Sequence, residues 1–136
     1  MQKGYRFLEH TADIMVSAYG PSLEDAIEQA AYAMFEVLGA EKGEKHAKSF
    51  EIEEKADTRD ELVVNFLSAV LAEAEINEIL PSKVEIGKLT QNPFEIKAKI
   101  EGTKERPKDH IKAVTYHQFK IEKKDNVFCI QVLFDV

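Results

Sequence analysis

The chain has 136 residues, the size of one ordinary domain that can bury a core without disulfides or metal. Its 25 Asp and Glu residues outnumber its 18 Lys and Arg residues, and the net charge of −7 argues against a surface built to neutralise nucleic-acid phosphates. The single cysteine, Cys129, lies in an apolar run, where we expect a small buried hydrophobe. One cysteine and no long apolar stretch predict a soluble, cytoplasmic protein without a membrane partner.

A polar cluster at residues 9–13 separates two strand-like runs, residues 5–8 and 14–19. In one interpretation it is a turn, in which a short polar side chain satisfies backbone N–H groups. In the other, His10 and Asp13 belong to a metal or proton-transfer site that residues elsewhere complete. The local sequence leaves both open.

Two helices are predicted from capping patterns and apolar spacing. A capping box at Ser22 opens the first, which Gly39 ends, and a second box at Thr58 opens another, which ends at Asn77 before Pro81. The predicted buried faces consist of Leu23, Ala26, Ile27, Ala30, Ala31, Met34, Phe35 and Leu38 in the first helix, and Leu62, Val63, Phe66, Leu67, Val70, Leu71 and Ala74 in the second.

The rest of the chain predicts strands. Residues 49–54, 83–86 and 94–101 form shorter ones, and residues 111–122 form a long strand that a hairpin turn joins to the apolar run 127–134. The last strand should be central, since it is almost wholly apolar. We therefore predict an α+β fold in a single domain over residues 1–136, with a mixed, mostly antiparallel sheet and two amphipathic helices packed on it.

The loop from Gly102 to Asp109 is charged and contains proline, so we expect it to be exposed and mobile. Its three basic residues could form a small basic patch, and three acidic residues near the end of the second helix either are solvated or contact a basic partner. The basic set is Lys104, Arg106 and Lys108, and the acidic set is Glu73, Glu75 and Glu78.

Asp135 is unusual because a carboxylate at the end of a buried strand needs hydrogen bonds, a cation or a metal. The α-carboxylate of Val136 follows it. Asp13 and Asp135 each adjoin a strand expected to enter the same sheet, and hard cations such as Ca²⁺ or Mg²⁺ prefer such oxygen clusters. This evidence alone is weak, because most pairs of carboxylates distant in sequence never meet.

Four blocks of sequence carry a resemblance to a known family. They are residues 5–14, with the block His-Thr-Ala-Asp; residues 22–35; residues 111–117, with the block Lys-Ala-Val-Thr-Tyr-His; and Phe-Asp-Val at residues 134–136. In this order and at this length the chain resembles the archease family throughout. The resemblance implies a small, non-catalytic protein that activates the RtcB-type tRNA-splicing RNA ligase. It would promote transfer of guanylate from GTP to the ligase's active-site histidine and so restore multiple turnover, with RNA and GTP reached through the ligase.

The resemblance also implies a bound divalent cation, held by Asp13, Asp135 and Val136, and the sequence departs from the family pattern at none of these positions. The alternative role for this cation is purely structural: it would tie the two ends of the chain together. We expect His10 to lie beside Asp13 and to orient it.

Three residues of the long strand are further candidates to support the site or face the partner. By alternation, Thr115 and His117 share the core face with Ile111, whereas Lys112 lies on the other face. His117 is then either a core-side histidine satisfied by a hydrogen bond or a residue that supports the metal ligands.

Two other classes of function remain open. A small metal-dependent hydrolase or nucleotide-processing enzyme would use His10, Asp13 and His117 as base and ligands. Against it, we find no glycine-rich phosphate loop and no nucleophile with an adjacent base, and the chain has only 6 glycines. A general chaperone or binding module would suit the acidic surface.

Overall fold

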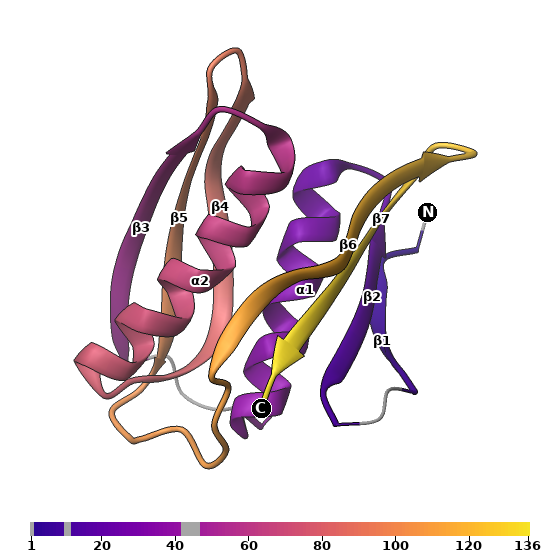
Figure 1. Cartoon of the computed structure of the whole chain (residues 1–136). Helices are drawn as coiled ribbons and strands as arrows, with labels where there is room; N and C mark the ends of the chain where they lie inside the picture. The colour runs from indigo at the N-terminus through magenta and orange to yellow at the C-terminus, as the bar shows by residue number, and fades with distance from the viewer. Residues whose placement is uncertain (1, 10–11, 42–46) are drawn as a thin grey trace.

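The computed structural model describes residues 2–9, 12–41 and 47–136 (Figure 1). Along the chain the elements are β1 (Gly4–Leu8), β2 (Ile14–Gly20), α1 (Leu23–Leu38), β3 (Lys48–Ala56), α2 (Arg59–Asn77), β4 (Leu80–Gln91), β5 (Phe94–Thr103), β6 (Ala113–Lys124) and β7 (Val127–Asp135).

The strands form two separate sheets, one in the order β1-β2-β7-β6 and one in the order β3-β5-β4. Every described strand pairing is antiparallel. The predicted α+β class with two helices is therefore confirmed, but the single mixed sheet is not. Alternation of apolar residues identifies the two faces of a strand and not its neighbour, so the sequence could not show the division. β7 lies between β2 and β6, which confirms its predicted central position.

Both helices begin and end where their caps predict. The Ser22 side chain accepts a hydrogen bond from the backbone N–H of Asp25 at 3.0 Å, and Gly39 ends α1 with φ 102°. Thr58 caps α2 in the same way, and Glu78 ends it with φ 52°. All predicted core positions of both helices are buried except Leu71, which is half-buried. Within the described residues, neither helix is long and apolar enough to cross a membrane.

The helices lie between the two sheets and share one core with them (Figure 1). α1 packs against β2 of one sheet and β4 of the other, and α2 packs against β3 and β6. Cys129 is an exception to the predicted core. It is half-buried, and its Sγ lies 3.2 Å from the Oγ of Ser17.

The segment from residue 104 to 112 is exposed at most positions, as expected, but it is anchored to the ends of the helices. The Lys104 ammonium donates a hydrogen bond to the Asn77 carbonyl at 3.0 Å, and Arg106 pairs with Glu78 at 3.1 Å. Neither helix has a basic residue in its last turn, so this segment supplies positive charge to the carbonyl end of α2. Lys104, Arg106 and Glu78 are therefore engaged within the chain.

Candidate functional site

The two candidate aspartates lie at the same end of the four-stranded sheet. Ile14 of β2 pairs with Phe134 of β7, and the register is antiparallel. Asp13 precedes Ile14 and Asp135 follows Phe134, so the same register places the two aspartates at neighbouring positions. The chain's C-terminal residue lies beside the C-terminal end of α1 (Figure 1). Strand pairing thus brings together residues that are more than a hundred positions apart in sequence.

A cavity of about 540 Å³ opens at this end of the sheet. Asp13 and Val136 both line it, whereas Asp135 is not part of the lining. The other lining residues come from β1, from the start of β2, from the last turn of α1 and from the segment before β6: Phe7, Leu8, Ile14, Glu36, Val37, Asp109 and His110. The structure therefore places Asp13 and Val136 around one space and adds polar groups beside them.

Backbone hydrogen bonds hold the segment before β6 in this place. The N–H groups of Lys108 and Asp109 both donate to the carbonyl of Leu38, at 2.9 and 3.4 Å, which satisfies the last residue of α1. The N–H of Lys112 donates to the Asp135 carbonyl at 2.7 Å. Asp109 and the next residue, His110, are thus fixed between the end of α1 and the end of β7.

Sequence reasoning missed Glu36, Asp109 and His110 as residues of this cavity. Glu36 looked like one more charge on the polar face of a helix, and the other two stood at the end of a charged loop. Only the anchoring of that loop to the end of α1 brings them next to Asp13. The one local signal was the Asp-His pair immediately before a strand, where polar side chains are often placed for function.

The predicted regular alternation of β6 is interrupted by a wide bulge. Thr115 pairs with Leu133, but the next paired residue of β6 is Lys120, opposite Gln131. The residues between them have a single residue of β7 to face, and Gln118 adopts the left-handed conformation with φ 56°. A hydrogen bond of 2.9 Å from the Gln131 side chain to the Gln118 carbonyl fixes the bulge.

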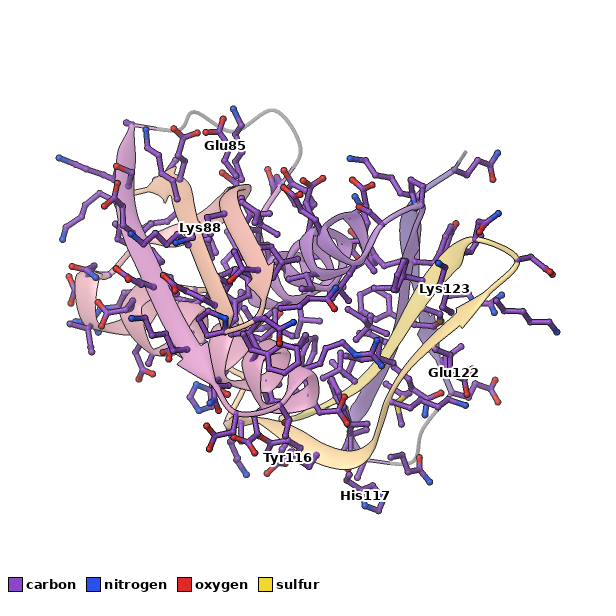
Figure 2. All side chains as sticks on the ribbon, turned by 90° about the horizontal axis from the view of Figure 1, so that it is seen from above. Glu85, Lys88, Tyr116, His117, Glu122 and Lys123 are labelled. Carbon is purple, nitrogen blue, oxygen red and sulfur yellow. The ribbon has the colours of Figure 1, made fainter. Side chains whose placement is uncertain are left out.

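The bulge overturns the predicted position of His117, whereas Ile111 is buried and Lys112 is exposed, as the alternation predicts. His117 is exposed and not on the core face, and Tyr116 beside it is 54% exposed. Figure 2 shows both residues at the periphery of the molecule. The buried residue is Val114, and Thr115 is half-buried and donates its hydroxyl to the Leu133 carbonyl at 3.1 Å. A pattern of period two cannot predict extra residues that the pairing with β7 dictates.

The remaining predicted site residues divide into two cases. His10 lies outside the described residues. Lys112 has an exposed side chain. Its backbone N–H donates a hydrogen bond to the Asp135 carbonyl, so Lys112 lies beside the candidate metal ligands.

Tyr5 adds a neutral donor next to this end of the molecule. Its hydroxyl donates a hydrogen bond to the Glu36 carboxylate at 2.9 Å. Burial, and then this bond and the charge of Glu36, raise the pKa of Tyr5 to about 12. The phenol therefore stays protonated at physiological pH and orients Glu36, which lines the cavity with Asp13.

The donor atoms of the candidate site suit a hard cation. Within the described part of the chain, no three His, Cys, Asp or Glu side chains are grouped so as to hold a metal. The candidate set therefore depends on two carboxylates, Asp13 and Asp135, and a main-chain or terminal oxygen of Val136. All of these donors are oxygens, which Ca²⁺ and Mg²⁺ prefer, and the set contains neither the thiolate nor the imidazole ligands typical of zinc sites.

Comparisons with known proteins agree over nearly the whole chain. The family model described as "Archease protein family (MTH1598/TM1083)" matches residues 5–136. A relative named Protein archease from Sulfolobus acidocaldarius is 31% identical, and the match covers 97% of this chain and 98% of that protein. A Protein archease from Methanosarcina mazei is 34% identical, with 98% and 97% covered. One from Thermococcus kodakarensis is 37% identical over 85% of each chain.

Solved structures share the fold. The solution structure of Methanobacterium thermoautotrophicum protein 1598 has a TM-score of 0.80 at 30% identity and covers 98% of this chain and 99% of its own. The crystal structure titled as an archease, possible chaperone, from Thermotoga maritima has a TM-score of 0.71 at 24% identity, with 95% and 94% covered. The chain belongs to the archease family.

Proposed function

We propose that this protein is a non-catalytic activator of the RtcB-type tRNA-splicing RNA ligase. In this proposal it promotes guanylylation of the ligase by GTP and so allows multiple turnover. Membership of the archease family supports the proposal, and the observation that carries it to particular residues is the β2–β7 register, which sets Asp13 beside Asp135.

The end of the four-stranded sheet that carries Asp13 and Asp135, which we call the acidic end, would be the working end, that is, the part that acts on the ligase. Asp13 and Asp135 would supply anionic oxygens to a divalent cation, and Val136 a main-chain or terminal oxygen. When bound, the cation supplies positive charge toward phosphate oxygens of the GTP held by the ligase. The Lys112 side chain, which is exposed beside Asp135, would pair with an anionic group brought by the partner.

The bulge of β6 offers the contact surface for the ligase. Tyr116 and His117 are exposed there, and exposed aromatic residues are frequent anchors of protein interfaces. Hydrogen bonding of Gln118 to Gln131 fixes their backbone before any partner arrives, which lowers the entropic cost of binding. The net charge of −7 supports contact with a protein and not extensive direct contact with RNA. We infer a cytoplasmic location, which the single cysteine supports because it can form no disulfide within the chain.

A multiple-turnover assay tests the class of function. Covalent guanylylation of the ligase by labelled GTP is followed with the ligase alone, with this protein added, and with an unrelated acidic protein of similar size added. We expect stimulation only with this protein, and no release of phosphate from GTP by this protein alone. Hydrolysis of GTP by the pure protein would instead support the metal-dependent hydrolase, and equal stimulation by the unrelated protein would contradict a specific activator.

A further inference from the structure

A second cavity, of about 680 Å³, lies beside the one that contains Asp13. It is bounded by β1, by α1 and by the start of β4, and Phe7 and Glu36 line both cavities. Its floor and walls are rich in aromatic rings, which come from Tyr5 and Phe7 of β1 and from Tyr32 and Phe35 of α1. We call it the aromatic groove.

The aromatic groove runs between two strands that are both at sheet edges. Among the described residues, β1 pairs only with β2, and β4 pairs only with β5. Each strand therefore has one side whose backbone N–H and C=O groups have no strand partner. Such an edge accepts an extended peptide by adding it as a further strand.

The rings are arranged as two edge-to-face pairs. Tyr5 and Phe7 have centroids 5.8 Å apart at 75°, and Tyr32 and Phe35 have centroids 5.9 Å apart at 87°. Phe35 is buried and forms part of the floor, whereas Phe7 is 42% exposed. In edge-to-face pairs the rings stand nearly at right angles, so ring faces point in more than one direction, and a ring face attracts a cation.

The charge of the groove is negative. Its lining contains Glu36 and Glu41 and, among the described residues, no Lys, Arg or His. Glu41 pairs with Lys108 outside the lining at 3.5 Å, so the negative charge of the groove is chiefly that of Glu36. Tyr5 donates to Oε1 of Glu36, and among the described residues no donor is bonded to Oε2. Lys3, next to β1, is already paired with Glu28 at 2.9 Å, and this hydrogen bond raises its pKa.

From these observations we propose that the aromatic groove binds an arginine side chain carried by an extended segment of a partner protein. A guanidinium stacks flat on aromatic rings and still donates an in-plane hydrogen bond, here to Oε2 of Glu36, so it suits the rings together with this carboxylate better than the compact ammonium of lysine does. The free edge of β1 suits the extended backbone. The inference goes beyond the proposed function, because it involves neither the cation nor the ligase's nucleotide.

The test uses the complete protein and synthetic peptides. A five-residue peptide, acetyl-Val-Thr-Arg-Val-Thr-amide, is titrated into ¹⁵N-labelled protein and followed by amide chemical shifts. The matched control peptide carries citrulline in place of arginine, which removes the charge and keeps the shape. We expect saturable shifts confined to β1, α1 and the start of β4, and binding at least about tenfold weaker for the citrulline peptide, because a charge-assisted hydrogen bond is lost.

Matched variants then test whether Glu36 is the carboxylate that binds the arginine. Glu36→Gln keeps an oxygen that can accept the Tyr5 hydroxyl, so the fold should persist, and it should weaken arginine binding by about tenfold or more. Glu53→Gln removes an exposed carboxylate on the other sheet and should change binding less than about twofold. Phe7→Leu keeps an apolar side chain without a ring face and should also weaken binding.

Several results would overturn the proposal. If the citrulline peptide bound as tightly as the arginine peptide, the charge would play no part in binding. If Glu36→Gln and Glu53→Gln weakened arginine binding equally, only a general attraction to an acidic protein would be left. The absence of saturable shifts in the groove would remove the site itself. The same shifts on concentrating the protein without peptide would show that a second copy of the chain occupies the groove.

Discussion

Gly102 lies where two strands approach too closely for any side chain. It is buried in β5, and its partner across the pair is Pro81 of β4. A Cβ added to Gly102 would overlap the Leu80 carbonyl oxygen and would lie 2.8 Å from its carbon and 2.9 Å from Cα of Pro81. All three contacts are backbone atoms, so no side chain can rotate away. Gly102→Ala must therefore displace β4 from β5.

We expect Gly102→Ala to lower the free energy of unfolding by about 3 kcal/mol, the upper end of the usual cost of overpacking. The entropy of unfolding of a chain of 136 residues is roughly 0.3 kcal/mol per kelvin, so the melting temperature should fall by about 10 °C. Thermal unfolding followed by circular dichroism measures this fall in the melting temperature.

Gly87→Ala is the matched control in the same sheet. Gly87 is exposed in β4, and the nearest atom to an added Cβ is the Lys97 carbonyl oxygen at 3.9 Å, an ordinary contact. This change should be neutral or stabilise the protein by up to about 1 kcal/mol, because alanine restricts the unfolded chain. If Gly102→Ala and Gly87→Ala melted within about 1 °C of each other, that result would contradict the close approach of β4 to β5 at Gly102.

Two further predictions concern the candidate site. Tyr5, whose pKa is raised to about 12, stabilises the fold fully below the pKa of an unfolded tyrosine, near 10, and this contribution is lost as the pH rises through about 12. The phenolate absorbance of the folded protein should contain a late-titrating phase that Tyr5→Phe removes; an unchanged titration would contradict the Tyr5–Glu36 contact. Ca²⁺ at a hundred times its dissociation constant should raise the free energy of unfolding by about 2.7 kcal/mol, an effect that a chelator reverses and that Asp13→Asn abolishes. An equal rise in Asp13→Asn would refute the metal site.

The helices could be predicted almost completely because their signals are local. Capping side chains such as Ser22 and Thr58 act within one turn, and the spacing of apolar residues reports one continuous buried face. The strands were located well, and the hairpin of β6 with β7 is confirmed. The other strand partners were not predicted, since their pairing depends on contacts between segments distant in sequence. The bulge around Gln118 was missed for the same reason: only the register with β7 requires it.

The candidate site could be predicted in part. Asp135 stood out because it ends an apolar strand, where a carboxylate needs a reason to be present, but its grouping with Asp13 and Val136 came from the resemblance to the archease family. Their neighbours on the cavity wall could not be found, since Glu36 and Asp109 reach it only through the packing of α1 and the anchoring of the segment before β6.

The most direct test of the central claim is the rate of ligase guanylylation by labelled GTP with Asp135→Asn compared with Asp125→Asn. Asp125 lies in the hairpin turn between β6 and β7, at the other end of the same strand pair, and its φ of 52° suits asparagine. The account predicts that Asp125→Asn stimulates the ligase like the native protein and that Asp135→Asn, although folded, does not. Full stimulation by Asp135→Asn would contradict the claim that the acidic end of the sheet is the working end.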